Sequence, residues 1–118
     1  MADITPALQA TTGASGARVY LWETLTAANA AGAAILLPGS TECVGAFTVT
    51  GTPDSATAVL QGSNDGTNWF TMLDKHGTAT SLTAAGAFEF ATAFKYIRPS
   101  TSGGGGSQDL DVIVTLRN

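Results

Sequence analysis

Residues 57–73 read TAVLQGSNDGTNWFTML, two apolar runs joined by a short polar segment. Residues 62–66 in its centre contain two glycines, an asparagine and an aspartate. The Asp65-Gly66 pair is a strong hairpin signal, because glycine readily adopts the positive φ that tight turns need. We therefore predict a β-hairpin here. A sugar or a cation would suit the polar tip, but turn geometry alone explains these residue types, and Trp69 fits a hairpin flank as well as a ligand platform.

Short β-prone runs bounded by turn residues continue on both sides of this hairpin. In the run at 44–50, Phe47 and Val49 share one face. The clearest two-residue period is in 110–117, where one face carries Leu110, Val112, Val114 and Leu116. The Ala-rich residues 25–34 are interrupted by Gly, Thr and Asn, so they predict either a turn of helix or a long loop. The Gly-rich residues 102–107 predict a flexible loop within the domain. Strands are further expected at 18–22, 34–37, 80–83, 88–91, 94–98 and 110–117.

The number and spacing of these runs predict the fold class. About eight short strands and no long helix are typical of an all-β protein, a single-domain β-sandwich or jelly roll. A chain of 118 residues has the size of one domain. Residues 1–16 have no sustained period, so we predict an extended N-terminal arm over 1–16 and a sandwich domain over 17–118. The arm is either a frayed terminus or a segment that pairs with a neighbouring subunit.

Charge and cysteine content narrow the classes of function. Charged residues make up 12% of the chain, the net charge is −4, and the basic residues are scattered, which argues against nucleic-acid binding. So few charges indicate a surface of small neutral residues, or one that is covered by another subunit or partner. Cys43 is the single cysteine, so no disulfide pairing within the chain is expected. No secretory signal and no membrane span are expected from the sequence.

The sequence contains no grouping of residues typical of catalysis. His76 is the single histidine, and no serine lies in a nucleophile-elbow context. Three of the candidate carboxylates, those of Asp54, Asp65 and Asp74, lie in predicted turns, where aspartate is expected anyway. We therefore expect no enzymatic activity, no cofactor and no metal site. Arg98 is expected to be a solvent-facing strand residue paired with Glu89 or an aspartate.

Several segments together resemble a known family. The chain resembles small virion structural proteins of tailed bacteriophages, and most closely the jelly-roll cement or decoration proteins that lie on the capsid shell. The likeness covers most of the chain from Tyr20 onward, although the sequence GSNDGTNW also resembles a hairpin of discoidin-like and other carbohydrate-binding sandwiches. The segments that carry it are YLWE (20–23), LPG (37–39), FTVTGT (47–52), VLQGSNDGTNW (59–69), YIRP (96–99), and the Gly-rich turn before the last alternating strand.

The resemblance implies a function and a set of partners. It implies a protein that binds the outer surface of a capsid, commonly as a homotrimer, and stabilises the shell by clamping neighbouring copies of the major capsid protein. It would be made in the host cytoplasm and located on the capsid exterior, with no nucleic-acid or membrane partner. The candidate partner-binding residues lie in the arm and the first strand: Ile4, Pro6, Leu8, Tyr20 and Trp22.

Two alternatives stay open. One is a carbohydrate-binding or adhesion module that exposes Trp22, Trp69 or Tyr96 to a sugar ring, and the other is a tail or neck component of the virion. Exposure of the aromatic rings separates the first alternative from the capsid role. Buried tryptophans favour the structural role, whereas an open aromatic platform beside Asn64 and Asp65 favours sugar binding.

Overall fold

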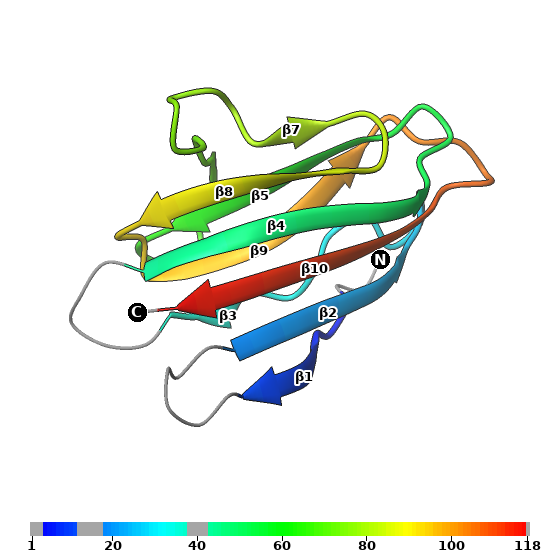
Figure 1. Ribbon diagram of the computed structural model, residues 1–118. Helices are drawn as coiled ribbons and strands as arrows, with labels where there is room; N and C mark the ends of the chain where they lie inside the picture. Colours follow the sequence, from blue (N-terminus) through cyan, green and yellow to red (C-terminus); the bar gives the residue numbers. More distant parts are fainter. Residues whose placement is uncertain (1–3, 12–17, 38–42, 118) are drawn as a thin grey trace.

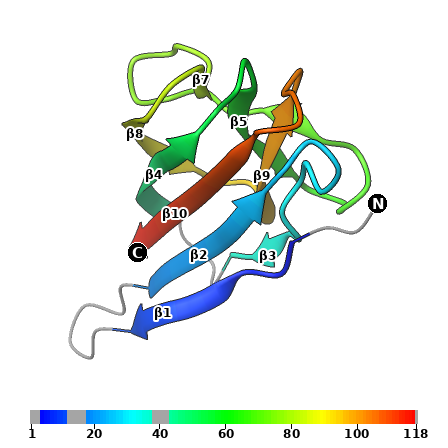
Figure 2. The ribbon, with the colours of Figure 1, turned by 90° about the vertical axis from the view of Figure 1, so that its right-hand side faces the viewer.

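The computed structural model describes residues 4–11, 18–37 and 43–117. Within these ranges the regular secondary structure consists of β-strands joined by turns and loops. The strands form two antiparallel sheets that pack face to face (Figures 1 and 2). The predicted all-β sandwich is therefore confirmed. The described residues form the strands β1 (Ala7–Thr11), β2 (Arg18–Leu25), β3 (Ile35–Leu36), β4 (Cys43–Thr52), β5 (Thr57–Ser63), β6 (Phe70–Thr71), β7 (Ser81–Leu82), β8 (Gly86–Thr92), β9 (Tyr96–Ser102) and β10 (Asp109–Arg117).

The strand order is that of a jelly roll. The first sheet has the order β1-β2-β10-β4-β8, and the second has the order β3-β9-β5-β6, with β7 also paired to β5. Without β1 and β7, each sheet has four strands, and most connections between successive strands cross from one sheet to the other, as two interlocked Greek keys require. The β5–β6 hairpin is an exception, because both of its strands lie in the second sheet.

The core lies between the two sheets, and the two-residue period of the strands fills it. In β10 the predicted face is confirmed, because Leu110, Val112, Val114 and Leu116 are all buried. Phe47 and Val49 of β4 face the same space. Trp22 is fully buried, and its Nε1 donates a hydrogen bond to the Ala33 carbonyl at 3.0 Å. Each fully buried large apolar side chain contributes about 1.5–3 kcal/mol to folding.

The hairpin predicted at 57–73 is present as β5, a tip and β6. Gln61 pairs with Thr71 and Gly62 pairs with Phe70. Gly66 has a φ of +75°, the conformation for which the Asp-Gly pair was expected. The tip is therefore a turn set by local backbone chemistry.

The segment that the sequence left open and the predicted Gly-rich loop both adopt defined backbone paths. Residues 26–34 contain bends and isolated bridges rather than a helical turn. The Gly-rich loop connects β9 and β10 inside the domain, as predicted, and it is tied to the β4–β5 turn. The Asp54 carboxylate accepts a hydrogen bond from Ser107 N at 2.9 Å, and the Asp54 carbonyl accepts one from Gly105 N at 3.0 Å. A side chain at Gly104 would collide with the buried Gln108 amide.

The described part of the N-terminal segment pairs with its own chain. Strand β1 adds to β2 at the edge of the first sheet, with Leu8 opposite Tyr20. Ile4 exchanges backbone hydrogen bonds with the 31–33 segment, through Ala31 O at 2.9 Å and Ala33 N at 2.7 Å. Residues 4–11 are thus extended, and their pairing joins them to the sandwich that was expected to begin at residue 17. The rest of the predicted arm, residues 1–3 and 12–16, lies outside the described residues.

Candidate functional site

The hairpin tip is organised around one carboxylate. Asp65 Oδ1 accepts hydrogen bonds from the backbone N of Thr67 and of Asn68, both at 2.8 Å, and from Ser63 Oγ at 3.0 Å. Asp65 Oδ2 accepts one from Asn68 Nδ2 at 2.7 Å. These bonds, those from the two backbone N–H groups first, hold the pKa of the Asp65 carboxyl well below its ordinary value. Both oxygens thus accept hydrogen bonds from within the turn, which fix the shape of the tip.

Beside the tip, four side chains form a compact group on the outer face of the second sheet. We call Gln61, Trp69, Tyr96 and Arg98 the Arg98 cluster. Gln61 of β5 lies directly opposite Arg98 of β9, so their side chains share one face of the sheet. Arg98 Nε donates a hydrogen bond to Gln61 Oε1 at 2.9 Å, and its guanidinium carbon lies 4.3 Å from the centroid of the Trp69 ring.

The Arg98 contacts differ from the expected ones. The sequence predicted an ion pair with Glu89 or an aspartate, but among the described residues Arg98 forms no ion pair, and Glu89 instead pairs with Lys75 at 3.8 Å. The prediction was wrong because strand register, which the sequence does not give, places a glutamine opposite Arg98. The guanidinium therefore packs over an indole ring, an arrangement that a planar, weakly hydrated cation favours.

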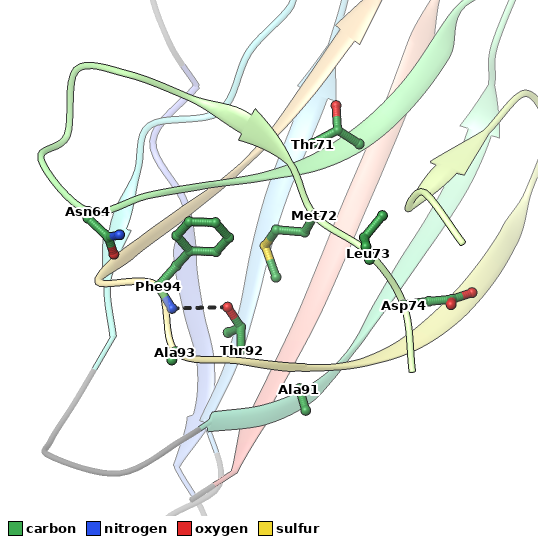
Figure 3. A pocket seen from close by; sticks show the side chains of 9 residues that line it. All are labelled: Asn64, Thr71, Met72, Leu73, Asp74, Ala91, Thr92, Ala93 and Phe94. Carbon is green, nitrogen blue, oxygen red and sulfur yellow. Dashed lines mark hydrogen bonds between the residues drawn. The ribbon is translucent and has the colours of Figure 1, made fainter. Parts of the chain in front are cut away.

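A groove opens between the edges of the two sheets. Its volume is about 530 Å³, and Figure 3 shows Met72 and Phe94 projecting into it from its two walls. One wall follows β6, and the other is the end of β8 with the residues after it. Thr92 Oγ1 accepts a hydrogen bond from Phe94 N at 3.1 Å and holds the second wall in a turn. We call this the β6–β8 groove. Its lining residues are Asn64, Thr71, Met72, Leu73, Asp74, Ala91, Thr92, Ala93 and Phe94.

The groove adjoins the free edge of β8, the last strand of the first sheet. Glu89 O accepts a hydrogen bond from Lys75 N at 3.2 Å, so the backbone groups of residues 87, 89 and 91 point away from β4. Among the described residues, the outward-pointing backbone N–H and C=O groups of Ala87 and Ala91 have no backbone hydrogen-bond partner. Leu73 is 56% exposed in the groove, and nearby Phe70 on β6 is 63% exposed. This region therefore combines apolar surface with unpaired strand edge.

The predicted partner-binding residues do not form one exposed surface. Ile4 and Tyr20 are half-buried and pack against the core, and Pro6 is half-buried. Trp22 is fully buried, so it has no surface with which to contact a partner or a sugar. Leu8 lies in β1, opposite Tyr20 in the backbone register. Of the three aromatic residues proposed as a sugar platform, Trp69 lies under the Arg98 guanidinium, Tyr96 lies two residues before Arg98 on β9, and Trp22 is in the core.

Other reactive side chains are dispersed. Cys43 is buried, and this burial raises the pKa of its thiol. His76 is exposed in the turn that Asp74 closes, where Asp74 Oδ1 accepts hydrogen bonds from Thr78 N and His76 N. The bond from Thr78 is the main cause that lowers the pKa of the Asp74 carboxyl. Within the described ranges, no group of three or more His, Cys, Asp or Glu residues is placed to hold a metal ion.

Sequence reasoning missed Gln61, Leu73 and Phe94 as surface-forming residues. Gln61 becomes notable through its cross-strand partner, and Phe94 because its ring lies where a side chain at Gly62 would be. The sequence signal closest to this site was the glycine at position 62, since a glycine inside a strand often marks a close approach of another group.

Comparisons with known proteins identify no relative. No protein-family model matches the sequence, and neither a curated protein nor a solved structure is significantly similar to the chain. In the described part of the chain, no helix is long and apolar enough to cross a membrane.

Proposed function

We propose that this chain is a decoration protein of a tailed-bacteriophage capsid, a structural protein without catalytic activity. It binds the outer surface of the shell and clamps neighbouring copies of the major capsid protein. The proposal rests on the sequence resemblance, and the jelly-roll fold is compatible with it, since this fold is common in viral capsid proteins and in lectins. Fold alone does not imply function, whereas a surface suited to protein contact would support a capsid-binding role.

The structural observation that best supports the proposal is the free edge of β8 beside the β6–β8 groove. Exposed strand edges readily pair with other protein, and natural proteins normally protect them with charge, bulges or a covering segment. Here the backbone N–H of Lys75 occupies the edge at Glu89, whereas Ala87 and Ala91 on the same edge are exposed. Leu73 in the groove adds exposed apolar surface beside the edge. A sister subunit or a capsid protein that added a strand here would satisfy the backbone groups and bury the groove.

The mechanism is mechanical. Each contact would be modest, but a homotrimer presents it three times, and a shell repeats the contact many times, so the attachments add by avidity. The low charge of the chain, 12% of residues, fits a protein that lies against other protein over part of its surface.

Two measurements test this proposal. Light scattering at several concentrations is expected to give about three times the monomer mass of 11.9 kDa. Immunogold labelling of virions from the source culture, with antibody against the purified protein, is expected to mark the heads. Labelling of tails would instead establish the tail or neck alternative, and virions without label would overturn a virion role. An Ala91→Pro variant removes one edge N–H, and it should weaken head binding while the matched Ala84→Pro variant, in an exposed bend, should not.

A second candidate, a sugar-binding or adhesion module, is favoured by a different observation. Trp69 and Tyr96 are half-buried side chains next to the polar tip that holds Asn64 and Asp65. Aromatic surface beside Asn64 and Asp65 is the feature that favours sugar binding. The two candidates use different regions, since the Arg98 cluster lies on the outer face of the second sheet and the groove lies between the sheet edges.

A further inference from the structure

Arg98 is held in one orientation by two independent contacts. Its Nε is bound to Gln61 Oε1 at 2.9 Å, and its guanidinium plane is supported by the Trp69 ring at 4.3 Å. Both supports come from the neighbouring β5–β6 hairpin rather than from β9 itself. A guanidinium fixed in this way loses little further rotational freedom when it binds a ligand.

The outer end of the guanidinium remains open. The Nε atom makes the described hydrogen bond, whereas neither Nη atom donates to any described residue. No carboxylate lies within 4.0 Å of Arg98 among the described residues, although the chain has nine acidic residues against five basic ones. The Asp65 carboxylate in the nearby tip is occupied by the hydrogen bonds of its own turn. The two Nη groups thus form a vacant donor fork that matches a planar carboxylate.

The surroundings of the fork fit a sugar ring. Tyr96 lies two residues before Arg98 and on the same face of β9, and Lys95 Nζ is 5.5 Å from the Tyr96 ring centroid, which adds a second positive charge. Gln61 uses its Oε1 for Arg98, so its Nε2 remains as a donor. Apolar aromatic surface with a few directed polar groups is the usual chemistry of a small-ligand site.

We propose that the Arg98 cluster binds a carboxylated sugar, of the uronic acid or sialic acid class. The ligand carboxylate accepts hydrogen bonds from the two Nη groups of Arg98, and the pyranose ring lies against Tyr96 and the edge of Trp69. Gln61 is a positioning residue that also donates to a ring hydroxyl. Nucleic acid fits less well, because phosphate backbones require many cations and this face presents Arg98 and Lys95. The inference rests on the second candidate function, and it is independent of capsid attachment.

Tryptophan fluorescence tests the proposal directly. The chain has two tryptophans, and Trp22 is fully buried, so ligand-dependent changes report on Trp69. The probes are glucuronate, N-acetylneuraminate, acetate and glucose, each titrated to about 50 mM at constant ionic strength. At least one sugar acid is expected to give a saturable change at a lower concentration than acetate, and glucose is expected to give none. The proposal is overturned if acetate binds as tightly as both sugar acids, if glucose binds equally well, or if no sugar acid binds.

Charge-matched variants separate a specific fork from general attraction. Arg98→Gln is expected to weaken binding of the sugar acid about tenfold or more, because a charge-assisted pair is lost. Arg98→Lys keeps the charge without the fork and should also lose most of the affinity. Arg117→Gln, at the exposed end of β10, makes the same charge change elsewhere and should leave affinity within about twofold. Equal weakening by Arg98→Gln and Arg117→Gln would refute the assignment.

Gln61→Ala tests the positioning role. It should weaken binding by less than Arg98→Gln does, and the NMR signal of Arg98 Nε–H should lose its protection from exchange with water. Unchanged exchange of that proton would contradict the role of Gln61. Each variant is compared with the wild type by thermal unfolding, so that loss of fold is distinguished from loss of binding. Capsid attachment is measured by immunogold labelling and sugar binding by fluorescence, so each proposal can fail without the other.

Discussion

Replacement of Gly66 by alanine isolates the contribution of one backbone angle to the stability of the β5–β6 hairpin. Gly66 has a φ of +75°, and an added Cβ would meet only the Tyr96 ring, at 3.7 Å or more, which is ordinary van der Waals contact. The change therefore adds no collision. It does force an L-residue into the left-handed region.

The expected magnitude follows from two opposing terms. The left-handed conformation costs an L-residue roughly 1–2 kcal/mol. Replacement of glycine also lowers the entropy of the unfolded chain, which stabilises the protein by about 0.4–1 kcal/mol. The net destabilisation is therefore about 1 kcal/mol. For a chain of 118 residues this corresponds to a fall in Tm of about 4 °C.

Gly106→Ala is the matched control. An added Cβ at Gly106 meets nothing within 4 Å, and its φ lies outside the left-handed region. The same methyl group should therefore be neutral or stabilising there, by up to about 1 kcal/mol. Gly66→Asn should cost less than Gly66→Ala, because asparagine tolerates the left-handed region better. Thermal unfolding followed by circular dichroism measures all three. Equal Tm values for Gly66→Ala and Gly106→Ala would refute the argument from φ.

Three further predictions concern single side chains. Because the folded-state pKa of Asp65 is lowered, its contribution to stability is present above the unfolded-state pKa of about 4 and is lost as the pH falls below it. Asp65→Asn should thus lower Tm at pH 7, and its difference from the wild type should shrink progressively as the pH falls below about 4. A pH-independent difference, or the same profile for exposed Asp109→Asn, would contradict this. Thr80→Val should cost about 1 kcal/mol in urea unfolding, since the buried hydroxyl lies 2.9 Å from Met72 O, and exposed Thr83→Val should cost nothing. Trp22→Phe removes the donor to Ala33 O and some core volume, so the free energy of unfolding should fall by about 1–3 kcal/mol; an unchanged value would place Trp22 outside the core.

Much of the fold was predictable because it depends on local patterns. The alternation in residues 110–117 and 44–50 gave the buried faces of β10 and β4, and the Asp65-Gly66 pair gave the β5–β6 hairpin. Both signals arise within a few residues, from the two-residue period of a strand and from the freedom of glycine at positive φ.

The candidate surfaces were predicted less well. Trp22 was chosen from the sequence as a partner-binding residue but lies in the core. The sequence did not indicate this, because it does not show whether the face of a strand that carries a tryptophan turns inward or outward. Arg98 was expected to have an acidic partner but lies over Trp69 and beside Gln61. The β6–β8 groove had no sequence signature, since one wall follows β6 and the other is the end of β8, two segments that are distant in the sequence.

The sequence by itself thus determined the class of fold, most of the strands, the Asp65-Gly66 turn and the inward faces of β4 and β10, because these follow from patterns among residues close together in the chain. The tertiary structure alone decided which strands became neighbours and in which register. In a jelly roll most neighbours are distant in sequence, and a shift of one residue would turn every side chain of a strand to the opposite face. That register places Gln61 opposite Arg98, and the crossing of strands between sheets leaves the β8 edge beside the groove.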